Sequence, residues 1–138
     1  MEAAQARERF ARARVARLAS VGPDGRPHVV PVAFALDGET IYSVVDEKPK
    51  RTVRLRRIEN LRERPAAAVL ADHYDEDWSR LWWVRADGLA RVLDGCGEEA
   101  ARAVALLAAR YPQQRAAGAV LAVDVERWSA WSAGGRRA

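Results

Sequence analysis

The clearest candidate for chemistry in this sequence is a run of basic residues at positions 48–57. The run reads Lys48-Pro49-Lys50-Arg51-Thr52-Val53-Arg54-Leu55-Arg56-Arg57 and holds six cations and no acidic residue. It follows a β-rich stretch and continues into a predicted helix, and backbone N–H groups at such a junction favour an anion. Adjacent cations repel one another unless an anion neutralises them, which favours an anion site over a solvated helix face. The run lacks the glycines of a P-loop, so a nucleoside triphosphate is not the predicted anion.

The excess positive charge of the chain is confined to this run. The whole sequence has 23 Lys and Arg against 19 Asp and Glu, a net charge of +4, whereas the residues outside the run carry 17 cations and 19 acids. With no second basic stripe, the sequence does not predict a nucleic-acid-binding protein. Trp82 and Trp83 could stack on bases, but neighbouring strand residues point to opposite faces, so only one could join a given platform.

Nucleophilic and metal chemistry find little support in the sequence. Neither His28 nor His73 lies in a recognisable Ser or Cys motif, and no catalytic side chain is predicted. Cys96 is the only cysteine, which excludes an internal disulfide and a multi-cysteine zinc site. The acidic stretch 72–77 does not match a compact metal-ligand spacing, and we interpret it as a solvated loop. The five tryptophans are expected in the core or an interface, with one or two available as the wall of a planar cofactor site.

Length and composition favour one compact domain over residues 1–138, because 49% hydrophobic residues suffice for a packed core. The longest apolar runs are far shorter than a membrane span of about 20 residues. The first residues, which include Glu2, Arg7, Glu8 and Arg9, lack the apolar core of a signal peptide. We therefore expect a cytoplasmic protein without a membrane partner.

Hydrophobic periodicity and turn signals predict short strands and helices in alternation. Helices are expected over 2–17, 51–64 and 97–110, and strands over 18–21, 28–36, 40–45, 66–71, 81–92 and 119–125. Asp37-Gly38 predicts a tight hairpin turn, Gly88 a bulge, and residues 128–138 a tail. Hairpin-linked strands with helices between them favour an α+β fold built on an antiparallel barrel over a parallel sheet.

A series of short motifs spans most of the chain. They are Leu18-Ala-Ser-Val-Gly-Pro-Asp-Gly-Arg-Pro-His28 with Val30-Pro31-Val32, Ile41-Tyr42-Ser43-Val44-Val45-Asp46, the basic run, Asn60-Leu61 with Pro65, and Trp83-Val84-Arg85-Ala86-Asp87-Gly88. Their order and spacing resemble the pyridoxamine 5′-phosphate oxidase-like (PPOX class) family of FMN-binding split barrels, over about residues 8–132. Three further motifs are similar to its branch of enzymes that depend on the deazaflavin coenzyme F420: Asp72-His73-Tyr74, Asp77-Trp78-Ser79 and Arg127-Trp128-Ser129.

The resemblance implies two strands that hold the tricyclic ring of the cofactor. One strand would flank the ring with its backbone, and the paired strand would lie beneath it. The residues that match these strands are Val30, Pro31 and Val32 in the first, and Ser43, Val44 and Val45 in the second.

The resemblance also implies anchors for the rest of the cofactor and for the substrate. Arg56 and Arg57 match a pair that holds the cofactor phosphate, and Lys48 and Lys50, in extra residues of this branch, are assigned to the cofactor as well. The remaining assignments are Trp82 and Trp83, which close the site near the ring, and Tyr74 and Trp78, which lie on the substrate side.

The activity that the resemblance implies is hydride transfer between F420 and an unidentified organic substrate, in a homodimer with the site between its subunits. An FMN-dependent oxidoreductase and a non-catalytic carrier of F420 are the open alternatives. No substrate-gripping arm follows Trp131, so pyridoxamine 5′-phosphate oxidation itself is not expected. The partners expected are a small-molecule substrate and a second copy of the chain.

Overall fold

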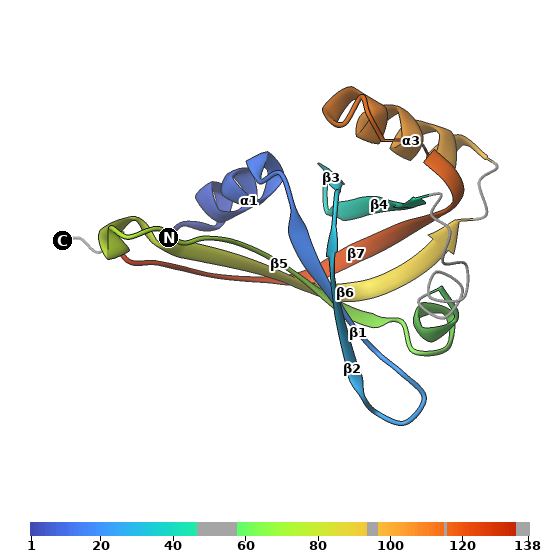
Figure 1. Ribbon diagram of the computed structural model, residues 1–138, viewed down its shortest axis with the longest axis horizontal. Helices are drawn as coiled ribbons and strands as arrows, with labels where there is room; N and C mark the ends of the chain where they lie inside the picture. The colour runs from blue at the N-terminus through green and yellow to red at the C-terminus, as the bar shows by residue number, and fades with distance from the viewer. Residues whose placement is uncertain (47–57, 94–96, 115, 135–138) are drawn as a thin grey trace.

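The structure is a computed structural model that describes residues 1–46, 58–93, 97–114 and 116–134. Its centre is a seven-stranded sheet in the order β2-β1-β5-β6-β7-β4-β3 (Figure 1), and all neighbouring strands are antiparallel. The strands are β1 (Ala16–Val21), β2 (Pro27–Val32), β3 (Ala35–Asp37), β4 (Thr40–Asp46), β5 (Ala66–His73), β6 (Trp82–Leu93) and β7 (Ala116–Ser132). The helices are α1 (Ala3–Arg12), α3 (Glu98–Arg110), the short 3-10 helix η1 (Trp78–Arg80), and helical residues 58–63. The predicted α+β fold class is confirmed.

The sheet curls into an open barrel because its two outermost strands are consecutive in the chain. The strand order begins with β2 and ends with β3, yet only Ala33 and Phe34 separate these strands. A flat sheet of seven strands could not bring its two edges within two residues of each other, since neighbouring strands lie about 4.8 Å apart. Figure 1 shows the resulting arrangement, in which β2 leads up into β3, and β3 lies beside β4.

Two helices cover the sheet at different places (Figure 1). The helix α1 is anchored by Phe10, which is fully buried and lies 4.8 Å from Phe34 and 5.2 Å from Trp128, measured between ring centroids. The helix α3 buries Ala103 and Leu107 in a second cluster with residues of β4 and β7. The charged faces of both helices are left toward solvent, as expected for amphipathic helices.

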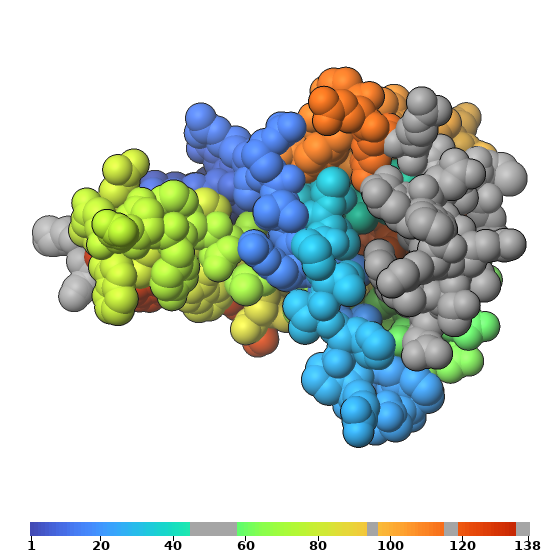
Figure 2. Space-filling model, viewed as in Figure 1, coloured from blue at the N-terminus to red at the C-terminus, as the bar shows by residue number. Residues whose placement is uncertain are grey.

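The hairpin of β5 and β6 forms a long arm together with the last part of β7. In the paired register, Trp82 lies opposite His73 in β5 and Ser132 in β7, and η1 connects the two hairpin strands at the tip. Figure 2 shows the tip of this arm (yellow-green) and the β1–β2 hairpin (blue to light blue) projecting from the body in different directions. None of the helices in the described residues combines the length and apolar character that a membrane crossing needs.

The structure corrects four of the predicted boundaries. The helix predicted over 2–17 ends at Arg12, because β1 begins at Ala16 with alternating burial in the sheet. The strand predicted over 28–36 is interrupted at 33–34 and forms β2 and β3. The predicted loop 72–77 is shortened by β5, which extends to His73, and the predicted tail from 128 is part of β7 as far as Ser132. The helix predicted over 51–64 is described only for residues 58–63.

Candidate functional site

The most distinctive place in the sheet is where β2 and β4 separate. The strands β3 and β4 pair as a hairpin, with Ala35 opposite Tyr42, and this register continued would place Val32 opposite Val45. Instead, Val32 pairs with Ala16 of β1, and β4 pairs with β7 on its other side. The hairpin therefore divides beyond Ala35, and we call the gap between β2 and β4 the split.

Both strands present unpaired backbone edges to the split. The strand β2 has one neighbour in the sheet, β1, and β4 has only β7 beside it beyond Tyr42. In an antiparallel strand every second residue turns its N–H and C=O away from a given neighbour. Within the described part of the chain these outward groups have no sheet partner. The ladder between β4 and β7 also shifts register between Val44 and Asp46, and such irregularities often lie beside functional sites.

Around the split, the backbone is available for contact with a ligand, because several of the side chains there are buried. Val32, Ser43 and Val44 keep 8%, 8% and 6% of their surface exposed, so these side chains point into the protein. Val30 is half-buried against the main core, and Pro31 is exposed. The predicted role of residues 30–32 and 43–45, contact through the backbone rather than through side chains, stays a prediction, and the burial of Val32, Ser43 and Val44 is consistent with it.

An arginine and a tyrosine from the end of α3 fix the point where the strands divide. The Phe34 carbonyl accepts hydrogen bonds from Arg110 Nη1 at 2.7 Å and from the Tyr111 hydroxyl at 3.0 Å. Arg110 Nη2 also donates to the Ala13 carbonyl at 2.6 Å, just beyond the end of α1. The Arg110 guanidinium carbon lies 5.1 Å from the centroid of the Phe34 ring. These contacts give the interrupted backbone the partners that a continuous strand would have provided.

A groove on the outer face of the sheet adjoins β2. We call it the outer groove; its volume is about 450 Å³, and it is lined by Arg17, Ala19, Val29, Ala68, Leu70, Asp72, Tyr74, Trp83 and Arg85. Tyr74 is 66% exposed and Val29, next to Val30 in β2, is 62% exposed, so the groove offers apolar surface to a ligand or to another protein. An ion pair of 3.1 Å between Arg17 and Asp72 lies among the lining residues.

The two tryptophans predicted to close the cofactor site lie on opposite faces of β6. Trp83 lines the outer groove, whereas Trp82 lines a separate cavity beneath α1. This is the alternation that neighbouring strand residues must show. Of the predicted residues, the structure thus brings Trp83 and Tyr74 together beside β2. Trp82 is elsewhere, and Trp78 is 72% exposed on η1 and lines neither hollow.

The predicted phosphate-binding residues belong to a segment that the structure does not describe. Lys48, Lys50, Arg56 and Arg57 lie outside the described residues, so their assignment to the cofactor stays a prediction. Among the residues that the structure describes, no three His, Cys, Asp or Glu side chains are gathered closely enough to hold a metal ion.

A charged network connects α3 to the sheet away from the split. Arg91 donates to both carboxylate oxygens of Glu99, at 2.9 and 2.8 Å, and to Asp124 at 2.6 Å. Together with a hydrogen bond from the Tyr42 hydroxyl, Arg91 lowers the pKa of Glu99 to about 2. Burial, and then the hydrogen bond to Glu99, raises the pKa of Tyr42. The network is a structural clamp, since both carboxylates are already neutralised by Arg91.

Two sets of structurally important residues were not predicted from the sequence. Arg110 and Tyr111 act on Phe34 across 76 and 77 positions, and Arg9 stacks on Trp82 across a similar separation. No local sequence pattern predicts such partners, because each pair joins residues more than 70 positions apart. Only the placement of the helices on the sheet identifies them.

A curled antiparallel sheet whose edge hairpin divides, with a backbone-lined split at the division, defines a split barrel. Residues 3–132 match the family described as pyridoxamine 5′-phosphate oxidase, and the chain belongs to that family. The predicted family is therefore confirmed. A comparison with curated protein sequences gives no significant match.

Solved structures with the same fold include proteins named for different cofactors. An FAD-binding protein from Mesorhizobium loti is 22% identical, with a TM-score of 0.73 and coverage of 94% of each chain. A heme-binding protein from Mycobacterium smegmatis is 23% identical, with a TM-score of 0.72, over 96% of this chain and 54% of that one. An F420 reductase is 24% identical, with a TM-score of 0.60, over 86% of this chain and 91% of that one. At these identities the likeness shows a shared fold.

Proposed function

We propose that this protein is a homodimeric oxidoreductase that binds the deazaflavin F420 in the split and transfers a hydride between it and a small organic substrate. The observation that carries the proposal is the pair of unpaired backbone edges at β2 and β4. They occur at residues 30–32 and 43–44, which the family resemblance independently assigns to the cofactor ring. The family to which the chain belongs supports a flavin-type cofactor.

The split suits a flat tricyclic ring with polar groups along its rim. Unpaired strand edges offer N–H donors and C=O acceptors, which are the partners that the ring's own carbonyl and N–H groups require. The buried side chains of Val32 and Val44 leave the approach to these groups free of bulky atoms. When bound, the deazaflavin supplies the hydride chemistry, and the chain orients the ring and excludes water.

The outer groove supplies the surface for the second subunit in this proposal. It is predominantly apolar, and its exposed Val29 and Tyr74 side chains adjoin the strand that forms one side of the split. Burying such a surface stabilises an association at roughly 25 cal/mol per Å² of apolar area. Because Trp83 and Tyr74 line the outer groove, we assign both residues to the site. Trp82 and Trp78, which do not line the outer groove, are not assigned to the same protomer's half of the site.

A titration of the cofactor-free protein with F420, FMN, FAD and hemin tests the cofactor assignment. We expect F420 to bind with the lowest dissociation constant, because the basic run at 48–57 can neutralise the polyanionic tail of the deazaflavin as well as its phosphate. Tighter binding of FMN would replace F420 with FMN in the proposal. Preferential binding of hemin would remove the flavin assignment altogether.

The phosphate assignment has a direct test in the charge reversal of Arg56 and Arg57. The double variant Arg56→Glu/Arg57→Glu should raise the F420 dissociation constant by about tenfold or more, since charge-assisted hydrogen bonds are replaced by repulsion. The control is Arg26→Glu, whose exposed side chain forms an ion pair with Asp24 in the β1–β2 turn. Unchanged affinity in the double variant would refute the assignment.

A carrier of F420 is the alternative that binding data alone do not separate from an enzyme. Stopped-flow oxidation of the bound, reduced deazaflavin with a panel of organic acceptors separates the two. We expect at least one acceptor to oxidise the bound cofactor faster than it oxidises free cofactor. Equal rates across the panel would favour the carrier.

A further inference from the structure

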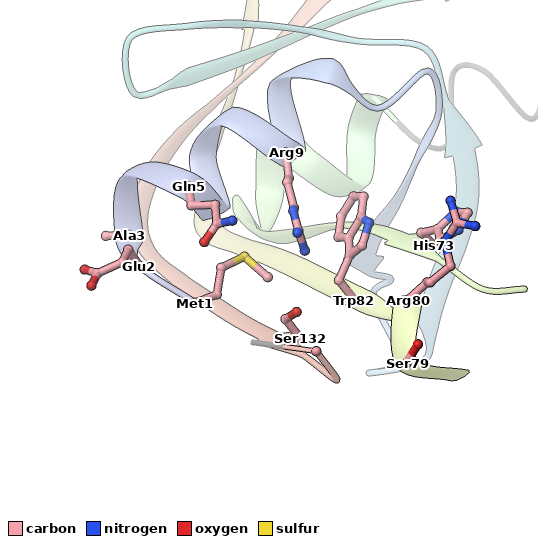
Figure 3. A pocket seen from close by; sticks show the side chains of 11 residues that line it. Met1, Glu2, Ala3, Gln5, Arg9, His73, Ser79, Arg80, Trp82 and Ser132 are labelled. Atoms are coloured by element: carbon pink, nitrogen blue, oxygen red, sulfur yellow. The ribbon is translucent and has the colours of Figure 1, made fainter. Parts of the chain in front are cut away.

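A large cavity beneath α1 lies apart from the split. Its volume is about 920 Å³, and it lies between the start of α1, η1, the first residue of β6 and the end of β7 (Figure 3). Along β7, Ser132 is eleven residues from Leu121, which pairs with Ser43 beside the split. At about 3.3 Å per residue the two places are roughly 35 Å apart along the strand. Within one protomer, the cavity is therefore a separate site.

Arg9 faces this cavity, and no acidic side chain in the described part of the chain pairs with it. It is half-buried, and its guanidinium carbon lies 5.6 Å from the centroid of the Trp82 ring (Figure 3). The neighbouring arginines on α1 and after it are engaged: Arg7 with Glu39, Arg12 with Glu8, and Arg14 with the Arg110 carbonyl. Arg9 has no hydrogen-bond acceptor among the described residues. A partly desolvated cation without a counter-ion is costly, and an anionic ligand would remove that cost.

A second cation, Arg80, also lines the cavity. It is exposed, its Nε lies 3.8 Å from an oxygen of Asp75, and it also interacts with the carboxylate of Asp77. The same oxygen of Asp75 lies 2.9 Å from His73 Nε2. Among the described lining residues, Arg9 and Arg80 are opposed by one carboxylate, Glu2. Arg9 is therefore the lining cation that has no ion-pair partner among the described residues, and it is independent of the basic run.

We propose that this cavity binds a planar aromatic carboxylate. The stacked pair of Trp82 and Arg9 offers a flat surface, on which an aromatic ring packs while its carboxylate reaches a guanidinium. The hydroxyl group of Ser132, also among the lining residues in Figure 3, supplies a further donor, whereas the Ser79 hydroxyl already donates to Asp77 at 2.7 Å. This inference does not rest on the proposed cofactor, because Trp82 and the outer groove are on opposite faces of β6.

Naphthalene carboxylate, its neutral carboxamide and inorganic phosphate are the probes that test the site. Binding is followed through the indole N–H signal of Trp82 in two-dimensional NMR, on the full chain without cofactor. We expect the carboxylate to bind in the micromolar to millimolar range, and the carboxamide and phosphate at least about tenfold more weakly, since each lacks either the charge or the ring. Equal binding of the carboxamide, or no binding of the carboxylate, would overturn the proposal.

Substitutions of Arg9 and Arg80 then test whether these two cations bind the ligand. Arg9→Gln and, separately, Arg80→Gln should each weaken naphthalene carboxylate about tenfold, whereas Arg12→Gln, on the same helix but outside the cavity, should not. Arg80 is exposed, so its variant keeps the test valid if Arg9→Gln disturbs the packing of α1. Unchanged affinity in Arg80→Gln and in a folded Arg9→Gln would refute the site. Competition by added F420 would show that the cavity is not separate from the cofactor site.

Discussion

Arg91 holds three elements together through two carboxylates. Its bidentate contact reaches Glu99 at the start of α3, and its Nε reaches Asp124 in β7. Bidentate arginine–carboxylate pairs are among the stronger hydrogen-bonded contacts, because two parallel bonds share one geometry. Tyr42 of β4 donates to the same glutamate at 2.7 Å, so the position of α3 depends on a few charged atoms.

The lowered pKa of Glu99 predicts a loss of stability in acid. Its folded pKa is about 2, below the ordinary value of 4.5, so the contribution is complete above pH 4.5 and is lost as the pH falls toward 2. The pKa of Asp124 is lowered in the same direction, mainly by Arg91. Solvent screening at this partly exposed pair limits the effect to about 1 kcal/mol.

Urea unfolding of the wild-type protein and of Arg91→Gln, at pH 7 and pH 3, measures this contribution. The unfolding free energy of both proteins should fall between pH 7 and pH 3. The fall should be smaller in Arg91→Gln than in the wild type, by about 1 kcal/mol. Arg26→Gln, which changes an exposed arginine outside the network, should behave as the wild type. An equal pH dependence in Arg91→Gln would show that the network does not set the pKa of Glu99.

At the scale of elements, β6 and β7 depend on a glycine where their register shifts. The shift falls between Asp87 and Gly88, as the sequence predicted. A Cβ at position 88 would lie 2.1 Å from the Asp124 carbonyl oxygen, which is backbone and cannot move aside cheaply. Gly88→Ala should therefore lower the unfolding free energy by about 2–4 kcal/mol.

Thermal or urea unfolding measures the effect, and Gly22→Ala is the matched control. At Gly22 an added Cβ would meet its nearest atoms at 3.6 Å or more, which is ordinary contact. We expect the control to change the stability by less than about 1 kcal/mol. If Gly88→Ala were as stable as the control, the close approach of β6 and β7 at this point would be wrong.

Elements with local signals were predicted from the sequence, and those fixed by distant residues were not. Asp37-Gly38 marks the hairpin, with Gly38 at a φ of 63°, and acidic residues open α3. The stretch 13–17 is as rich in Ala and Arg as α1, but the complete burial of Ala16, which pairs with Val32 of β2, overrides helical propensity. The break at 33–34 depends on Arg110, which is 76 residues from Phe34.

The candidate site likewise has features that could be predicted from the sequence and features that could not. The opposite orientations of Trp82 and Trp83 follow from strand alternation and were predicted. The assignment of residues 30–32 and 43–45 came from family resemblance, since their β-rich sequence does not reveal that the strands separate. The stacking of Arg9 on Trp82 joins residues 73 positions apart, and no local sequence pattern predicts it.

At the scale of the whole molecule, the proposed site requires two copies of the chain. Light scattering coupled to size exclusion should give about twice the 15.3 kDa mass of the chain. Val29→Asp introduces a charge into the outer groove and should shift the protein toward a monomer, because a charge is costly to bury in an apolar interface. Val15→Asp is the control: Val15 is also exposed, at 42%, and does not line the groove. A wild-type monomer would contradict the proposed assembly.

The proposed function depends on the split being the cofactor site. The most direct measurement is the change in backbone amide NMR shifts when F420 is added to the cofactor-free protein. We predict that the largest changes fall on residues 30, 32 and 43–45, on both sides of the split, with small changes at Arg9 and Trp82. Unmoved amides along β2 and β4, with the changes concentrated elsewhere, would contradict it.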